Sequence, residues 1–320
     1  MEKTKLGVSA CLLGQEVRYD GGHKHDRYIT DTLGSFFDFV PVCPEVECGL
    51  PIPREAMRLV GDPAAPRLLT NKTGIDLTQR MLNYAQGRVE ALAEDGLCGF
   101  IFKKDSPSSG LHRVKVYGEN GIPGKTGRGL FAAAFVAQFP LVPVEDEGRL
   151  NDPELRENFI ERVFAYNRLK ALLAGYGSDR TRGLGALVEF HTAHKLQLMA
   201  HSVPLYRELG ALVTQSKGKD LAILLKDYKG LFMKALSMLA TVKKNCNVLA
   251  HSMGYFKKDL SADEKAELLE IIDQYRNGFV PLIVPITIIR HYVRKYGESY
   301  LEGQIYFKPH PAELMLRNHV

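Results

Sequence analysis

The segment FVPVCPEVECGLPIPRE, residues 39–55, groups two cysteines with two glutamates. Cys43 follows an apolar run that is typical of a β-strand, and Cys48 comes five residues later, with Glu45 and Glu47 between the thiols. Thiolates bind soft metal ions and carboxylates transfer protons. The spacing C-x4-C occurs among the iron–sulfur ligands of plant-type ferredoxins. By itself the pattern leaves two interpretations open, a metal site or a pair of reactive or buried thiols.

The chain has five cysteines, and Cys11 follows another strand-like run. With Cys43 and Cys48 it makes three thiols. Structural zinc usually takes four protein ligands, so three thiolates suit a [4Fe-4S] cluster better, with one iron not bound by protein. We expect Cys98, at the start of a strand, and Cys246, in the second half, to be buried core thiols.

The first half of the chain alternates apolar runs with helical patterns. The apolar runs predict strands at Leu6–Ala10, Asp38–Val42, Cys98–Phe102 and Leu141–Val144. The helical patterns cover Asp26–Phe37, Ile75–Asp95 and Gly129–Gln138. This alternation is typical of an α/β domain with a parallel doubly wound sheet. The carboxyl ends of such strands share one edge, so we expect Cys11, Cys43 and the turn SPSSG at 106–110 to meet in one crevice.

The second half lacks that alternation and predicts an all-α domain. Asp152 can cap a helix that starts at Pro153, and Ser261 with Glu264 forms a capping-box pattern. Two more helices are expected at Leu184–Ser202 and Lys219–Ala240. We therefore divide the chain into an α/β domain at 1–148 and a helical domain at 149–320.

Charge is unevenly distributed between the halves. Residues 1–151 hold 18 Lys and Arg against 19 Asp and Glu, whereas residues 152–320 hold 24 against 18. A basic half can bind a polyanion or can simply be solvated. No convincing signal peptide starts the sequence, and no apolar run approaches the roughly 20 residues of a membrane span. These features predict a cytoplasmic protein, and they leave its oligomeric state open.

Five motifs, SACLLG with VRYDGG, CPEVECGLPIPRE, TGIDLT, FKKDSPSSG and GRGLFAAAF, lie in the order and spacing of the thiouracil desulfidase (TudS) family. Residues 5–147 resemble that family. The remainder resembles a YbgA-type helical domain, through FHTAHKLQLMAHS, NCNVLAHSMGYFKKDL and PLIVPITIIRHYV. The two-domain arrangement is similar to the RudS desulfidases, which remove sulfur from 4-thiouridine in tRNA. The resemblance implies the same substrate here, an expectation that spacing alone does not supply.

The chain departs from the family at one position. The single-domain family carries SPSCG in the serine turn, with that cysteine as third cluster ligand, whereas this chain has Ser109 there and gains Cys48. We therefore expect Cys11, Cys43 and Cys48 to bind the cluster; the alternative is a site with two cysteines and no cluster. The resemblance also implies that Glu45 transfers protons and that Ser106 assists it, with Asp20, Glu47 and Arg54 as weaker candidates.

These observations predict a [4Fe-4S]-dependent, non-redox desulfidase with a tRNA-binding helical domain. Two alternatives are desulfuration of free thiouracil or 4-thiouridine nucleotides, and a non-catalytic RNA-binding protein with a structural metal site. In the helical half His191, His194 and His201 share one helix face, where packing is favoured over metal binding. His251 and Tyr255, followed by lysines in GYFKKD, suit either RNA contact or an amphipathic helix end.

Overall fold

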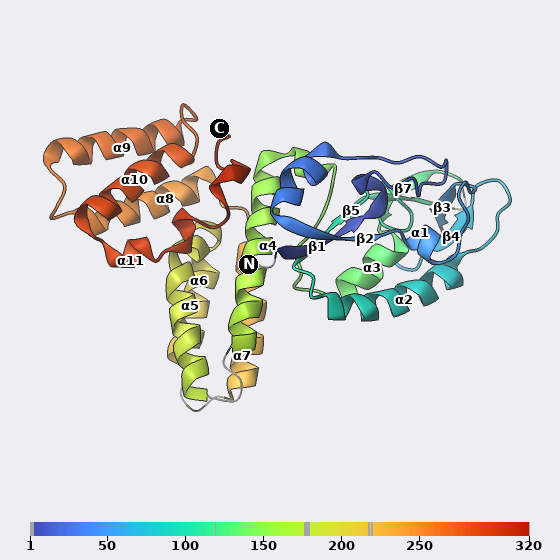
Figure 1. The fold of residues 1–320 in the computed structure, drawn as a ribbon, viewed down its shortest axis with the longest axis horizontal. Coiled ribbons are helices and arrows are strands. Elements are labelled where there is room, and N and C mark those ends of the chain that lie inside the picture. Colours follow the sequence, from blue (N-terminus) through green and yellow to red (C-terminus); the bar gives the residue numbers. More distant parts are fainter. Residues whose placement is uncertain (1–2, 119, 176–179, 217, 219, 320) are drawn as a thin grey trace. The chain divides into compact units, whose positions relative to one another are not determined.

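The computed structural model describes residues 3–118, 120–175, 180–216, 218 and 220–319. The chain forms two compact units, Met1–Asp152 and Pro153–Val320 (Figure 1). The boundary therefore falls between Asp152 and Pro153, slightly beyond the position at 148 taken from the sequence.

A four-stranded parallel sheet forms the centre of the first unit. Its strands, in spatial order, are β2 (Phe37–Val42), β1 (Thr4–Ser9), β5 (Gly99–Phe102) and β8 (Val144–Asp146). All three neighbouring pairs are parallel. The central strands β1 and β5 are almost fully buried, which explains their continuous apolar sequences. The doubly wound parallel sheet predicted from the sequence is thereby confirmed.

Two helices, α2 (Thr78–Asp95) and α3 (Leu130–Gln138), pack side by side on the sheet (Figure 1). The helix α2 buries residues spaced three or four apart, as its periodicity predicts: Met81, Ala85, Val89 and Leu92. The helix α3 inserts Phe135 against Phe100 of β5, with ring centroids 4.8 Å apart. Phe131 at the start of α3 also lies against Phe102 at the end of β5, with ring centroids 6.3 Å apart, so the start of α3 is held beside the end of that strand.

Two parts of the first unit differ from the sequence prediction. The segment expected as a helix at Asp26–Phe37 forms a π-helical turn, Tyr28–Thr32, and a 3-10 turn, Leu33–Ser35, before β2 begins at Phe37. The β-branched residues and Gly34 in this segment have low helix propensity. The last strand is also displaced, to Val144–Asp146, because Pro143 interrupts the expected run.

A second four-stranded sheet was not predicted. Its strands, in spatial order, are β4 (Arg67–Thr70), β3 (Met57–Val60), β6 (Val114–Tyr117) and β7 (Pro123–Gly127). Each has four or five residues, and β7 contains two glycines and a proline. Such short, glycine-rich segments give little periodic signal.

The second unit is entirely helical in its described residues, as predicted. Its helices are α4 (Pro153–Gly175), α5 (Arg180–His201), α6 (Val203–Thr214), α7 (Leu221–Leu236), α8 (Val242–Met253), α9 (Ala262–Arg276), α10 (Ile283–Tyr296) and α11 (Ser299–Glu302). The capping box at the start of α9 is present, since Ser261 and Glu264 exchange side-chain to backbone hydrogen bonds. Across the residues that the structure describes, no helix combines the length and apolar character needed to span a membrane.

Candidate functional site

A pocket of about 370 Å³ opens at the carboxyl edge of the parallel sheet. Strand order reverses there, because β2 lies on one side of β1 and β5 on the other. Ligands of doubly wound folds bind at this kind of switch point. Three strand ends contribute to the lining: Cys11 follows β1, Cys43 follows β2, and the serine turn 106–109 follows β5. The sequence prediction that these segments share one crevice is confirmed.

Cys11 and Cys43 both line the pocket, close enough for a charge on Cys43 to raise the pKa of Cys11. Cys11 lies in a 3-10 turn, Ala10–Leu13, and is 8% exposed. Burial raises the pKa of Cys11 to about 11 and also raises the pKa of Cys43 above its ordinary value. Without a bound metal both groups are therefore thiols, and metal binding would release their protons.

The one-turn helix α1 (Pro44–Glu47) follows Cys43 and separates it from Cys48. A helix turns about 100° per residue, so five residues leave the two side chains about 140° apart. The Cys48 thiol donates to the backbone carbonyl of Glu45 at 3.2 Å and packs against the core cluster that contains Leu59 and Leu68. Cys48 is not among the lining residues, so the structure does not bring it together with Cys11 and Cys43.

Ser109 lies where Cys48 was expected to be. It lines the pocket with Cys11 and Cys43 and is 4% exposed. A neutral hydroxyl is a poorer ligand for iron than a thiolate, whose softness favours iron–sulfur clusters. The pocket thus offers two thiols that suit an iron–sulfur cluster. A serine occupies the position where a third protein ligand would lie. The assignment of Cys48 as third ligand stays a prediction, and it requires α1 to rearrange.

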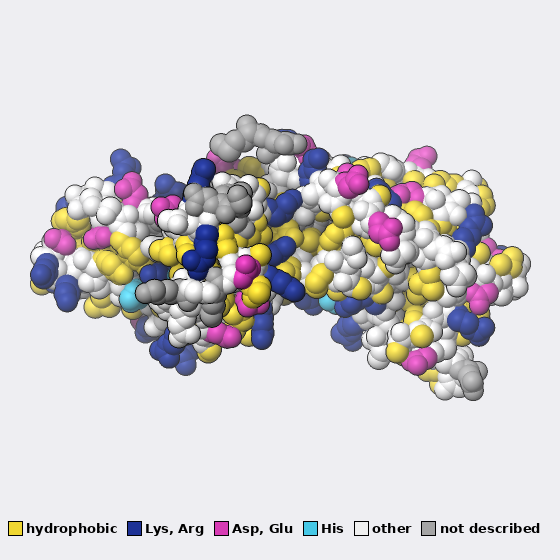
Figure 2. Space-filling view, turned by 90° about the horizontal axis from the view of Figure 1, so that it is seen from below, with side chains coloured by type: hydrophobic (Ala, Val, Ile, Leu, Met, Phe, Trp, Pro, Cys, Tyr) yellow, Lys and Arg dark blue, Asp and Glu magenta, His cyan; other side chains and the backbone are white. Residues whose placement is uncertain are grey.

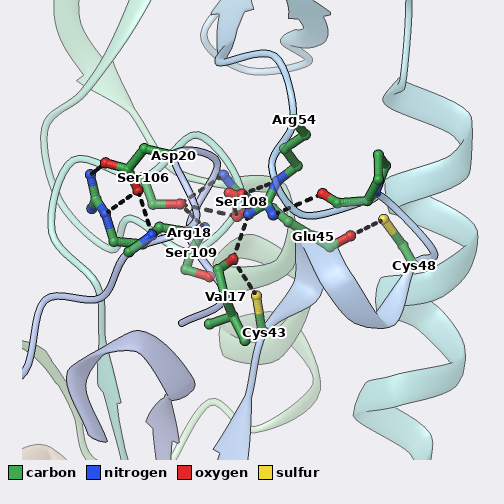
Figure 3. A network of polar contacts seen from close by, with 12 residues as sticks. Val17, Arg18, Asp20, Cys43, Glu45, Cys48, Arg54, Ser106, Ser108 and Ser109 are labelled. Carbon is green, nitrogen blue, oxygen red and sulfur yellow. Dashed lines mark hydrogen bonds and ion pairs between the residues drawn. The ribbon is translucent and has the colours of Figure 1, made fainter. Parts of the chain in front are cut away.

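Glu45 is held at the pocket wall by two partners (Figure 3). Its Oε2 accepts from Arg54, whose Nε lies 3.0 Å away and whose Nη2 completes an ion pair. Its Oε1 accepts from the Ser108 hydroxyl at 2.8 Å. Because Arg54 also donates to the Val17 carbonyl at 2.9 Å, the carboxylate is fixed in orientation.

The serine turn supplies a chain of hydroxyls that leads to Glu45. Ser106 and Ser108 share a hydrogen bond of 3.0 Å between their Oγ atoms. The Ser106 hydroxyl also accepts from the backbone N–H groups of Ser108 and Ser109 at 3.3 and 3.1 Å, a geometry that closes the turn. Sequence reasoning selected Ser106 but missed Ser108, the direct partner of Glu45. The only signal for Ser108 was its place within SPSSG.

The serine turn also caps α3. The carbonyl of Ser108 accepts from Phe131 N at 2.9 Å, and the carbonyl of Pro107 accepts from Leu130 N at 3.3 Å. This close packing requires glycine at 129, because a Cβ there would lie 2.5 Å from the Ser108 carbonyl. The motif GRGLFAAAF therefore positions the serine turn.

The weaker candidates, Arg54, Asp20 and Glu47, lie in three different surroundings. Arg54 contacts Glu45, as described. Asp20 pairs with Arg18 at 3.3 Å and its side chain is 47% exposed, so it belongs to a surface turn. Glu47 accepts hydrogen bonds from Cys43 N, Tyr84 and Arg88.

The three histidines of α5 are buried and have separate partners. His191 shares a hydrogen bond with Tyr228 at 3.2 Å, and His194 accepts from Arg168 at 3.2 Å. His201 lies 3.4 Å from Glu161. Burial lowers the pKa of His191 to about 4 and that of His194 to about 3. These contacts confirm packed histidines, and the described residues contain no group of three His, Cys, Asp or Glu that could hold a metal ion.

Comparisons with known proteins match the two units separately. Residues 6–147 match the family described as 2-thiouracil desulfurase, and residues 195–311 match a protein family of unknown function (DUF1722). The uncharacterized protein YbgA of Escherichia coli (strain K12) is 34% identical over 170 residues, which cover 53% of this chain and 98% of YbgA. The uncharacterized protein YbbK of Bacillus subtilis (strain 168) is 32% identical over 111 residues, covering 32% of this chain and 71% of YbbK.

One solved structure, titled [4Fe-4S]-dependent thiouracil desulfidase TudS, is 31% identical in sequence. It covers 47% of this chain and 95% of its own, with a TM-score of 0.38.

The fold and pocket define an α/β domain with a thiol and carboxylate site at its topological switch point, joined to a helical domain. The chain belongs to the 2-thiouracil desulfurase family through its first domain, and its second domain is of the YbgA type. The protein is therefore an enzyme of the desulfidase class. This membership favours an enzyme over the alternative of a non-catalytic RNA-binding protein.

The contact at Gly129 predicts that Gly129→Ala displaces the serine turn. The added Cβ meets backbone atoms, which cannot move aside like a flexible side chain. We expect desulfidase activity to fall at least tenfold and the melting temperature to drop, both measured on purified protein. Gly87→Ala is the matched control, because Gly87 lies in α2 and a Cβ there would meet no atom within 4 Å. At that position alanine stabilises the helix by up to about 1 kcal/mol. Unchanged activity in Gly129→Ala would show that the turn tolerates displacement.

Proposed function

We propose that the protein is a [4Fe-4S]-dependent, non-redox desulfidase that removes sulfur from 4-thiouridine in tRNA. Water replaces the sulfur at the thiocarbonyl carbon, so the products are uridine and sulfide and no electrons are exchanged. The observation that carries the proposal is the convergence of Cys11, Cys43 and the hydrogen-bonded pair Glu45–Ser108 on one pocket. We place the reaction in the cytoplasm, where thiols stay reduced.

Cys11 and Cys43 would hold the cluster. The positive charges of Lys103 and Arg18 lower the pKa of Cys11, and the charge of Arg54 lowers the pKa of Cys43. Each charge therefore favours the thiolate. These cations suit an anionic cluster. When bound, a cluster that has an iron without a protein ligand would supply a Lewis acid for the departing sulfur.

Glu45 and the two serine hydroxyls would carry the protons of the reaction. An attacking water must lose protons, and the sulfide that leaves must gain them. Glu45 Oε1 is the proton acceptor, connected by the Ser108 hydroxyl to Ser106, which also lines the pocket. Arg54 occupies Oε2 and so keeps Oε1 directed at the hydroxyl chain.

The proposed tRNA contact uses the surface near Tyr255 in the helical unit. Tyr255 is 37% exposed and stacks on Tyr300 with ring centroids 5.1 Å apart, and the exposed Lys257 and Lys258 follow it in the chain. Aromatic faces stack on unpaired bases and lysines bind phosphates. Lysine and arginine side chains are also spread over the face of the protein in Figure 2. In the first unit the lining residues Lys24 and Lys104 suit the phosphates beside the modified nucleotide.

A second candidate substrate is a free thionucleobase or 4-thiouridine nucleotide. The volume of the pocket, about 370 Å³, favours this possibility, since ligand pockets of roughly 300–1,000 Å³ accept small molecules. With such a substrate the helical unit would not contribute to recognition.

The ligand assignment predicts that Cys11→Ala and Cys43→Ala lose the cluster, because each removes one of the two thiolates in the pocket. Iron and sulfide should be counted after anaerobic reconstitution. In the described arrangement Cys48→Ala retains iron, whereas Ser109→Cys increases cluster occupancy by adding a third thiolate. Cys98→Ala is the control for a buried thiol outside the pocket. Loss of iron in Cys48→Ala would establish Cys48 as the third ligand and show that α1 rearranges.

The proton role of Glu45 predicts that Glu45→Gln keeps iron near the wild-type content but lowers turnover by about 10²–10⁴-fold. The amide preserves the shape of the side chain and removes its proton acceptor. Single-turnover sulfide release measures the effect, and Glu94→Gln, at an exposed site on α2, is the control. A loss below tenfold would restrict Glu45 to a structural role.

Recognition of tRNA predicts that turnover on 4-thiouridine in tRNA falls steeply with salt, while turnover on the free nucleotide changes little. Lys257→Ala and Lys258→Ala should each reduce the slope of log affinity against log salt by about 1. Tyr255→Ala should weaken tRNA binding, and Tyr255→Phe should preserve it. Filter binding across a salt series measures these effects, with Lys72→Ala in the first unit as the control. Equal salt dependence on both substrates would favour the small-molecule alternative.

A further inference from the structure

The carboxylate of Glu47 joins the start of α1 to the helix α2. Its Oε1 accepts from the backbone N–H of Cys43 at 2.7 Å. Its Oε2 accepts from the Tyr84 hydroxyl at 2.7 Å and from Arg88 Nε at 3.1 Å. Tyr84 and Arg88 lie four residues apart on α2, so they present their donors on the same helix face.

The helix α1 needs such support. It has one turn, and a single turn is unfavourable in isolation because it fixes several dihedral angles for very few hydrogen bonds. Cys43 is its N-cap residue, and its own side chain makes no capping bond. The Glu47 side chain instead returns to the N-cap amide, like the second half of a capping box. The backbone of Cys43 is thus held by a residue one helical turn further on.

The other end of α1 is attached to the same helix. Arg80 Nε of α2 donates to the Cys48 carbonyl at 2.7 Å. Burial, with the adjacent Glu47 carboxylate, raises the pKa of Tyr84, so its hydroxyl remains a donor. Both ends of α1 are therefore bonded to a long helix whose apolar face belongs to the core.

We propose that Glu47 is a positioning residue that keeps the Cys43 thiol in the pocket by tying the Cys43 backbone to α2. It does not line the pocket, so it acts through Cys43. A role of Glu47 in supporting the cluster rests on the proposed function. The tether itself, meaning the hydrogen bonds that join Cys43 through Glu47 to α2, can be tested on the metal-free protein. Transient opening of the turn at Cys43 must break the hydrogen bond from the Cys43 backbone N–H to the charged carboxylate of Glu47. Loss of such a bond shifts an equilibrium by about tenfold to a hundredfold.

The test is the rate of Cys43 alkylation by iodoacetamide in reduced, metal-free protein, followed residue by residue by mass spectrometry. We expect Glu47→Ala to speed alkylation of Cys43 by about 10–100-fold, because the turn opens more often. Cys98, 1% exposed at the amino end of β5, serves as the internal reference for global opening, and its rate should not change. Glu94→Ala is the matched surface control.

Glu47→Gln separates the tether from a simple charge effect, since removing a negative charge can itself make a nearby thiol more reactive. The glutamine keeps an acceptor for Cys43 N–H, so its rate should rise much less than that of Glu47→Ala. Equal rates in the two variants, or no change in either, would overturn the proposal. A parallel rise at Cys98 with a lower melting temperature would make Glu47 a general stabiliser. Tyr84→Phe removes only one of the donors to Glu47, so Cys43 should be alkylated at a rate between those of wild type and Glu47→Ala. This variant tests the proposal if Glu47→Ala does not fold.

A second measurement addresses the cluster. In anaerobically reconstituted protein, Glu47→Ala should lose iron to a chelator such as bipyridyl faster than wild type, while Glu94→Ala should not. If wild-type protein binds no cluster, the proposed function fails, yet the alkylation rates still decide whether Glu47 positions Cys43. Faster alkylation of Cys43 together with unchanged iron loss would show that the tether does not serve the cluster.

Discussion

The reversal of strand order between β2, β1 and β5 is the constraint on which the site depends. Parallel strands end at a common edge, and at a reversal the two following segments leave in opposite directions, which opens a crevice. At this edge Lys103 N donates to the Ser9 hydroxyl at 2.9 Å, so the ends of β1 and β5 are directly joined. Cys11, Cys43 and the serine turn are brought together by sheet topology, although almost one hundred residues separate the first from the last.

The second level of organisation is a set of hydrogen bonds between those strand ends. Glu45, which follows β2, accepts a hydrogen bond from the hydroxyl of Ser108, which follows β5. The carbonyls of the serine turn accept hydrogen bonds from the first backbone N–H groups of α3. A displacement of α3 is therefore transmitted to Glu45 through two hydrogen bonds. Catalytic groups need positions accurate to a fraction of an ångström. Here the packing of α3 on the sheet supports that accuracy, because the first residues of α3 are hydrogen-bonded to the serine turn.

The sequence identified the parallel sheet because its central strands, β1 and β5, are buried on both faces and read as continuous apolar runs. It located Cys11 and Cys43 because each follows such a run. It could not locate Cys48, since the direction of that thiol depends on α1 being helical, and a one-turn helix has no periodic signal. The role of Ser108 was equally hidden, because its bond to Glu45 spans 63 residues. The second sheet was missed because its strands are short and depend on pairing with one another.

The helical unit shows how polar residues in a motif can be used for folding rather than for recognition. Glu161 is 2% exposed and accepts from Gln197 at 2.6 Å, with His201 3.4 Å away and Arg317 at 3.8 Å. Buried charges must be paired, since an unpaired charge costs several kcal/mol. The conspicuous segment FHTAHKLQLMAHS therefore contributes mostly internal contacts. The proposed contact with tRNA would therefore use exposed cations such as Lys257 and Lys258, which lie outside this segment.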